Sequence, residues 1–156
     1  MKAAPRITLS RHDGAPLTLP DPAGRQAWLL YFMRTSDCPP CISHVQRIDR
    51  ELDVLRALGL EPLIVVPEGQ PAAATLRARF GLRVAVAGSP LDDVHALFGL
   101  QKKLFGIAQQ SGTVLVGGDG QIHLERVATI PLNSYRHEEV LEVARGMVLR
   151  HQLAST

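Results

Sequence analysis

Residues 35–41 read TSDCPPC and contain both cysteines of this 156-residue chain. The run before them, residues 27–33 (AWLLYFM), is apolar throughout and has no helical stripe, which predicts a strand buried on both faces. The run after them predicts an amphipathic helix that ends at Gly59, because apolar side chains recur every three or four positions: Ile42, Val45, Ile48, Leu52, Leu55 and Leu58. A second apolar run, residues 63–66, follows. The cysteine pair therefore stands at the strand-to-helix junction of a strand–helix–strand unit.

Cysteines at the start of a helix are suited to redox chemistry. The unpaired N–H groups and the positive end of the helix dipole stabilise a thiolate, which is the form that attacks a disulfide or a peroxide. We predict that Cys38 is the attacking thiol and that Cys41, one turn further into the helix, is the resolving thiol. Two cysteines at this spacing can close a disulfide without refolding the chain. Pro39 and Pro40 have no N–H, so we expect the Cys41 N–H to be the main backbone partner of the Cys38 sulfur.

The same residues allow a metal-binding alternative. Cys38, Cys41 and His44 form a Cys-x2-Cys-x2-His pattern, and such ligands suit a soft ion such as Cu(I) or Zn(II). No fourth ligand is evident, so the sequence favours a solvent-facing His44 over a metal ligand. The charged side chains near the cysteines in the sequence are Asp37, which opposes a thiolate, and Arg34, His44 and Arg47, which favour one.

Length and composition predict one ordinary globular domain over residues 1–156. The chain is 46% hydrophobic and 21% charged, with a formal net charge of +2, and its arginines are dispersed, so we expect no nucleic-acid or membrane partner. No apolar stretch is long enough to span a bilayer, and the N-terminus lacks the apolar region of a secretory signal. We therefore expect a cytoplasmic protein, in which a dithiol is catalytic rather than a structural disulfide. The sequence predicts no bound cofactor or metal.

The rest of the chain alternates between strand and helix patterns. The strand patterns are an N-terminal hairpin at the sheet edge (residues 7–10 and 16–19), residues 83–87, and a closing hairpin (residues 113–116 and 122–127) around Gly117-Gly118-Asp119-Gly120. Three helix patterns remain: residues 72–80, a segment that begins after Ser89, and residues 136–150. In the middle one, Ser89 is the expected N-cap, and Pro90, Asp92 and Asp93 lie in the first turn. Its side chains expected to point inward are Val94, Leu97 and Phe98. Residues 100–110 are expected to be irregular. This order predicts an α/β fold with a mixed central sheet and helices on both faces.

The chain resembles the thioredoxin fold, because a Cys-x-x-Cys follows the first core strand and a hairpin and helix close the chain. Over residues 7–150 it is most similar to the peroxiredoxin-like (AhpC/TSA, redoxin) branch. The segments that carry the similarity are Leu17-Thr18-Leu19-Pro20, Thr35-Ser36-Asp37-Cys38, residues 112–116 with Asp119-Gly120, and Ile130-Pro131. The resemblance implies a thioredoxin-like α/β fold with the N-terminal hairpin as an extension.

The site departs from the peroxiredoxin pattern. That family carries Pro-x-x-x-Thr-x-x-Cys, and here Thr35 and Cys38 match while Tyr31 stands at the proline position. Thr35 is either a peroxide-binding hydroxyl or a cap of the helix start. The family also places an arginine before the late strand, where this chain has Ser111. Arg34 and Arg126 are the candidates to replace that cation.

The site departs from the thioredoxin pattern as well, since Asp37 replaces the tryptophan before the first cysteine and Gly112 replaces the cis-proline. We predict an enzyme, a redoxin-type thiol-disulfide oxidoreductase. The alternative is a thiol peroxidase that works through a Cys38 sulfenic acid. The implied partners are a dithiol reductant such as a thioredoxin-type protein and an oxidised protein or hydroperoxide substrate. The resemblance also allows a homodimer.

Overall fold

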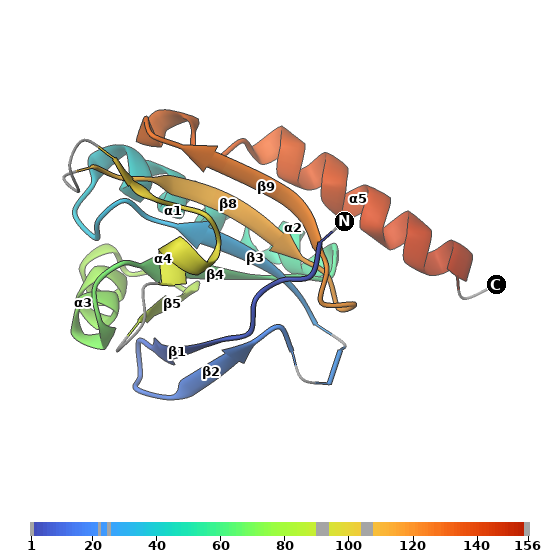
Figure 1. Cartoon of the computed structure of the whole chain (residues 1–156), viewed down its shortest axis with the longest axis horizontal. Helices are drawn as coiled ribbons and strands as arrows, with labels where there is room; N and C mark the ends of the chain where they lie inside the picture. Colours follow the sequence, from blue (N-terminus) through green and yellow to red (C-terminus); the bar gives the residue numbers. More distant parts are fainter. Residues whose placement is uncertain (1, 22, 25, 90–93, 104–107, 155–156) are drawn as a thin grey trace.

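Strand β3 (Ala27–Phe32), which leads into the cysteine motif, lies inside a seven-stranded sheet (Figure 1). The computed structural model describes residues 2–21, 23–24, 26–89, 94–103 and 108–154. Across the sheet the strands follow one another as β2 (Pro16–Leu19), β1 (Ile7–Arg11), β5 (Ala85–Gly88), β4 (Leu60–Val66), β3, β8 (Ser111–Val116) and β9 (Ile122–Ala128). The N-terminal hairpin occupies one edge, as predicted.

The sheet is mixed. Strands β3, β4 and β5 are parallel to one another, whereas β8 and β9 are antiparallel to their neighbours, as is β1 to β5. Tyr31 of β3 lies beside Ile64 of β4 on one side and Thr113 of β8 on the other. Parallel neighbours require crossover connections, and helices supply them here. The first core strand is therefore buried in the sheet with its C-terminal end at the cysteine motif.

Helices cover both faces of the sheet, as the sequence predicted, but in unequal shares. One face is covered by α1 (Pro39–Arg50), α2 (Leu52–Ala57), α3 (Gln70–Phe80) and α5 (His137–Ala154). On the other face, the single turn α4 (Val94–Leu97) packs with the N-terminal hairpin. Within the described residues, none of these helices combines the length and apolar character needed to cross a bilayer.

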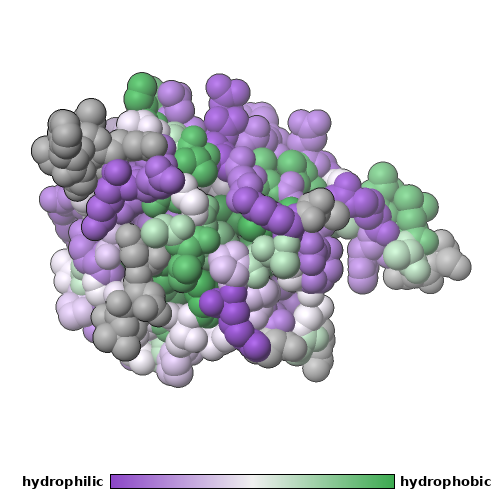
Figure 2. Space-filling view, in the orientation of Figure 1, coloured by the Kyte–Doolittle hydropathy of each residue, from purple (hydrophilic) through white to green (hydrophobic). Residues whose placement is uncertain are grey.

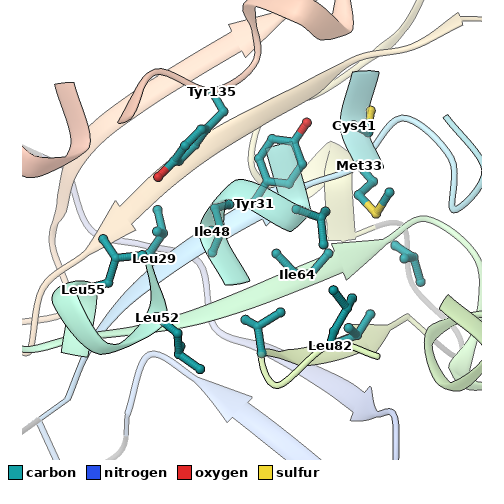
Figure 3. Close-up of a cluster of buried hydrophobic side chains, with 14 of the residues drawn as sticks. Leu29, Tyr31, Met33, Cys41, Ile48, Leu52, Leu55, Ile64, Leu82 and Tyr135 are labelled. Atoms are coloured by element: carbon teal, nitrogen blue, oxygen red, sulfur yellow. The ribbon is translucent and has the colours of Figure 1, made fainter. Parts of the chain in front are cut away.

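Alternate residues of β3 supply both cores. Leu29 and Tyr31 point into the cluster under α1, α2 and α5, and Leu30 and Phe32 point into the cluster on the opposite face. This follows from the two-residue period of a strand. All four side chains are fully buried, which explains why the run is apolar throughout rather than alternating. Figure 3 shows the cluster that contains Tyr31 and Cys41.

The helix predicted up to Gly59 is interrupted. Its apolar stripe is buried as expected, but Glu51 leaves helical geometry (φ −96°, ψ 12°) and separates α1 from α2. The prediction of an inward Leu97 is wrong, because its side chain is 52% exposed while Val94 and Phe98 are buried. In a helix as short as α4, one face holds only two or three positions, and Leu97 falls outside it.

Other boundaries also differ from the expectation. Residues 100–110 include a short antiparallel pair, β6 (Lys102–Lys103) with β7 (Ala108–Gln109), rather than being wholly irregular. The third core strand covers 85–88 instead of 83–87, and α5 runs on to Ala154. Pro90, Asp92 and Asp93 of the predicted helix start lie outside the described residues. Figure 1 shows the far end of α5 extending past the sheet, and Figure 2 shows apolar surface there. Leu149 and Leu153 of α5 are exposed.

Candidate active site

The two cysteines sit at the first turn of α1. Cys38 is the N-cap residue and Cys41 lies in the first turn, with Pro39 and Pro40 between them. Both are free thiols; Cys38 is 7% exposed and Cys41 is 0% exposed. The arrangement gives a substrate a route to Cys38 and none to Cys41. The Cys38 side chain makes no capping hydrogen bond, so the predicted Cys41 N–H partner is wrong for the reduced site.

The Cys41 side chain is fully buried. The backbone N–H of Arg34 donates to its sulfur at 3.4 Å. Burial, which removes water from the thiolate, raises the pKa of Cys41 to about 12, and the neighbouring Cys38 adds to the rise. The Arg34 N–H and Tyr31 hydroxyl act in the opposite direction. Cys41 is therefore a protected thiol in the resting site.

Tyr31, on the strand that leads to the cysteines, is hydrogen-bonded to Ser134, which lies 103 residues later in the sequence. Its hydroxyl lies 2.7 Å from Ser134 Oγ, and Ser134 Oγ donates to the Pro131 carbonyl at 2.5 Å. The backbone of Ser134 is held in turn by Thr113, whose hydroxyl donates to the Ser134 carbonyl at 2.6 Å. Burial strongly raises the pKa of Tyr31, and the nearby Cys41 charge adds to the rise. The hydroxyl is therefore protonated at any working pH.

The loop before Cys38 is fixed by two carboxylates. Thr35 Oγ1 donates to Asp37 Oδ1 at 2.7 Å, and Ser36 donates to Glu68 Oε2 from its N–H (3.2 Å) and its hydroxyl (3.0 Å). Within the described part of the chain, the other Glu68 carboxylate oxygen is buried without a hydrogen-bond partner. Of the two roles considered for Thr35, the structure does not show the helix cap: its hydroxyl donates to Asp37 inside the loop.

His44 and Arg47 of α1 make polar contacts with residues other than the cysteines. His44 Nε2 donates to the carbonyls of Pro131 and Leu132 at 3.2 and 3.0 Å, in the short 3-10 turn η1 (Pro131–Asn133). The expected solvent-facing histidine is therefore wrong, since the ring is half-buried against η1. Arg47 Nε lies 3.8 Å from Glu51 Oε1, and the side chain lines a groove of about 720 Å³ between α1 and α5.

The metal alternative gains no support from this geometry. His44 uses Nε2 to hold η1, and in the ranges that the structure covers no three His, Cys, Asp or Glu side chains come close enough together to bind an ion. The remaining histidines near the core act in packing. His95, for example, is buried and lies 2.8 Å from the Met33 carbonyl.

No cation stands in the place where the peroxiredoxin resemblance implies one. Ser111 is fully buried, and its hydroxyl makes no hydrogen bond to any described residue. Arg126, one candidate replacement, forms a two-pronged ion pair with Glu139 of α5 at 2.9 Å for both bonds. Arg34 contributes its backbone N–H to Cys41. Gly112 leaves no room for a side chain, because a Cβ there would lie 2.2 Å from the Arg126 carbonyl.

Sequence reasoning located the cysteines but missed the polar residues around them. Tyr31, Ser134 and Glu68 each make a hydrogen bond at the site, and none matches a residue of a recognised motif. The one available signal was a tyrosine in an apolar strand, since a buried tyrosine hydroxyl needs a partner. No comparable signal marks Ser134 or Glu68, which reach the site from distant segments.

Similar folds occur among solved structures of thiol enzymes. Peroxidoxin BcpB from Mycobacterium tuberculosis superposes with a TM-score of 0.81 at 13% identity, covering 94% of this chain and 96% of that one. The reduced 2-Cys peroxiredoxin of Plasmodium vivax superposes with a TM-score of 0.79 at 16% identity, covering 97% of each chain. A putative thiol:disulfide interchange protein DsbE from Chlorobium tepidum superposes with a TM-score of 0.70 at 20% identity, covering 95% of this chain and 96% of that one. At these identities the likeness confirms the thioredoxin-like fold.

Sequence comparison supplies the family. No curated protein matches the chain, but residues 1–124 match the AhpC/TSA family. That match includes the whole cysteine loop, strand β3 and the late strand β8. Together with the free dithiol at the helix start, it confirms the expected resemblance: the chain belongs to the AhpC/TSA family of thiol-dependent oxidoreductases.

Proposed function

We propose that the protein is a thiol-disulfide oxidoreductase in which Cys38 attacks the oxidised substrate and Cys41 resolves the adduct. The observation that carries this is the placement of both thiols in one helical turn, with Cys38 7% exposed and Cys41 0% exposed. The thiol that a substrate can reach stands at the helix N-terminus, where a thiolate is stabilised. The other waits behind it as a buried thiol, with its pKa raised to about 12.

The proposed reaction takes two steps. The Cys38 thiolate attacks one sulfur of a substrate disulfide, so that a Cys38–substrate bond forms and the first substrate sulfur leaves as a thiol. Cys41 then loses its proton and attacks the Cys38 sulfur, which forms the Cys38–Cys41 disulfide and releases the second substrate thiol. The substrate gains two electrons and two protons, and a dithiol donor reverses the change in the protein.

Disulfide exchange is favoured over peroxide reduction, because groups that could assist a peroxide are absent or already paired. The Thr35 hydroxyl donates to Asp37, so it is not free to donate to a bound peroxide. Ser111 offers no cation, and Arg126 is paired with Glu139. A peroxidase needs a donor or cation to polarise the O–O bond. The peroxidase alternative keeps one supporting feature, the Thr35-Ser36-Asp37-Cys38 sequence within an AhpC/TSA domain.

The assignment of the two cysteines is tested by trapping. The Cys41→Ser variant, treated with a small disulfide, should accumulate a stable mixed disulfide on Cys38, which intact-mass measurement detects as one added substrate half. The matched Cys38→Ser variant should accumulate little, because Cys41 is buried. If Cys38→Ser accumulates the adduct instead, the roles are reversed.

A second measurement separates the two chemistries. The rate at which fully reduced protein loses thiols to hydrogen peroxide is compared with that of a free thiol at the same pH. We expect rates of the same order, because the Thr35 hydroxyl is held by Asp37 and the Arg126 side chain is paired with Glu139. A rate several orders of magnitude faster would make the peroxidase the correct function.

The partners follow from this chemistry and are part of the proposal. A thioredoxin-type dithiol protein would reduce the Cys38–Cys41 disulfide, and an oxidised protein would be the substrate. A reducing compartment such as the cytoplasm suits a dithiol that must be returned to the reduced state. A homodimer stays a prediction, which light scattering on the purified protein would test.

A further inference from the structure

The turn that leads into Cys38 has its own side chains bound to one another. Residues 35–38 close this turn, in which the Cys38 N–H donates to the Thr35 carbonyl at 3.3 Å. Across the turn, Thr35 Oγ1 donates to Asp37 Oδ1 at 2.7 Å. A hydroxyl has a single proton to donate, so the proton of Thr35 is committed to the carboxylate. Disulfide exchange makes no use of this bond, so the bond needs another explanation.

A hydroxyl in this turn is suited to act on a peroxide. When a Cys38 thiolate attacks a hydroperoxide, the O–O bond breaks and negative charge develops on the departing oxygen, which a hydrogen-bond donor stabilises. The turn carries two hydroxyls. That of Ser36 donates to Glu68 at 3.0 Å in a partly buried position, whereas the bond from Thr35 to Asp37 is exposed. Thr35 is therefore the hydroxyl that an incoming peroxide meets at this turn.

The Asp37 carboxylate competes strongly for the Thr35 proton. Hydrogen bonds to an ionised acceptor are short and about twice as strong as those to a neutral one, and this bond is 2.7 Å long. Asp37 is exposed, and the structure gives it no ion pair with any described residue, so no cation draws the carboxylate away from Thr35. A neutral peroxide is the weaker acceptor and loses this competition.

We propose that Asp37 is a specificity-determining residue: by accepting the Thr35 hydroxyl, it withholds the donor that a peroxide needs and leaves disulfide exchange as the reaction of Cys38. This rests on the proposed function and names what directs the site away from the alternative substrate. Asp37 acts through Thr35, so it is a positioning residue rather than a catalytic one.

The reaction that Asp37 holds back can be written in full. The Cys38 sulfur forms a bond to one peroxide oxygen as the O–O bond breaks, and the other oxygen leaves as hydroxide and takes up a proton from solvent. A released Thr35 hydroxyl donates a hydrogen bond to that departing oxygen. The Cys38 sulfenic acid then condenses with the Cys41 thiol, which gives the Cys38–Cys41 disulfide and a second water. The peroxide is reduced by two electrons and the dithiol is oxidised.

The test measures two rates on each variant and takes their ratio. Fully reduced protein reacts with hydrogen peroxide in one experiment and with hydroxyethyl disulfide, which is neutral, in the other, and thiol loss is followed under the same conditions. A change in the reactivity of Cys38 itself moves both rates, so the peroxide-to-disulfide ratio reports help given to the peroxide alone. We expect Asp37→Ala to raise this ratio about tenfold, the effect of one hydrogen bond to a developing charge.

Two further variants separate the hydroxyl from the charge. Asp37→Asn is the matched control, because it removes the charge and keeps an acceptor oxygen for Thr35; its ratio should stay within about twofold of the parent's. Adding Thr35→Val to Asp37→Ala removes the released hydroxyl and keeps the shape of the side chain, so the ratio should return to the parent's value. Circular dichroism checks that each variant is folded.

The possible failures are separate. If Asp37→Ala keeps the parent's ratio while Cys38 still exchanges disulfides, the inference alone is wrong. It is also wrong if Asp37→Asn raises the ratio as much as Asp37→Ala, since charge then decides, or if the double variant keeps the raised ratio, since the gain then does not come from Thr35. If the parent protein already reacts with peroxide several orders of magnitude faster than a free thiol, the proposed function fails, and this inference fails with it.

Discussion

At the scale of single residues, the reactivity of Cys38 is set by opposing features of its loop. The start of α1 favours the thiolate, and the carboxylate of the preceding residue, Asp37, opposes it. Asp37 has a second role, because its Oδ1 accepts the Thr35 hydroxyl at 2.7 Å. The two roles can be separated, since an asparagine keeps the acceptor oxygen and removes the charge.

We expect Asp37→Asn to speed the attack of Cys38 on a small disulfide by about two- to threefold at low ionic strength, because the exposed negative charge next to Cys38 in the sequence is lost. The gain should shrink in salt, which screens such charges. Asp37→Ala removes the acceptor as well and frees the Thr35 hydroxyl. If Asp37→Asn is unchanged at low salt, the carboxylate does not act on Cys38.

At the scale of elements, the β8–β9 hairpin brings two backbones very close. Gly112 of β8 pairs with Val127, and a Cβ on it would lie 2.2 Å from the Arg126 carbonyl and 3.1 Å from Leu100. The nearer contact is backbone, which cannot move aside as a side chain can. Gly146 of α5 offers the opposite case, since a Cβ there meets only the end of Arg150, at 3.7 Å.

Gly112→Ala should therefore lower the free energy of unfolding by about 2–3 kcal/mol, as overpacking does in cores. Gly146→Ala should raise it by about 0.5–1 kcal/mol, because alanine is the better helix former. Urea unfolding of the two variants beside the parent protein measures both. Equal stability of Gly112→Ala and the parent would mean that the hairpin can open at this position without cost.

At the scale of the whole molecule, the packing of α5 on α1 contains a buried histidine. His137 is 8% exposed; its Nδ1 is hydrogen-bonded to the Tyr135 hydroxyl at 2.9 Å, and its Nε2 lies 3.9 Å from Glu51 Oε2. Burial lowers the pKa of His137, the positive charge of Arg47 lowers it further, and the acidic Glu51 and Glu138 partly offset this. The folded protein therefore binds this proton less readily than the unfolded chain.

The sign of the pH effect follows. The stabilising contribution of neutral His137 is complete above its unfolded pKa, about 6.5, and is lost as the pH falls through that value towards the lower folded pKa. We expect His137→Gln to lose less stability than the parent between about pH 8 and pH 5 in urea unfolding. His151→Gln, at an exposed position further along α5, should follow the parent. Identical pH slopes for His137→Gln and the parent would contradict the prediction.

The sequence by itself determined the elements and the position of the thiols. The unbroken apolar run without a helical stripe predicted a strand covered on both faces, and Leu30 and Phe32 do face a second core. The stripe from Val45 to Leu55 is buried as its spacing predicted. These features act within a few residues, through side-chain period and turn geometry, so they can be read without knowing the fold.

The tertiary structure alone decided what surrounds the thiols. Tyr31 meets Ser134 across 103 residues of sequence, His44 meets Pro131 across 87, and Ser36 meets Glu68 across 32. Each pair exists because the sheet order and the packing of η1 and the β4–α3 loop bring distant segments to one helix start. A buried polar group takes whichever partner packing places within hydrogen-bond distance, and no local pattern encodes that partner. This is why the cysteines could be predicted from sequence while the hydrogen-bond partners around them could not.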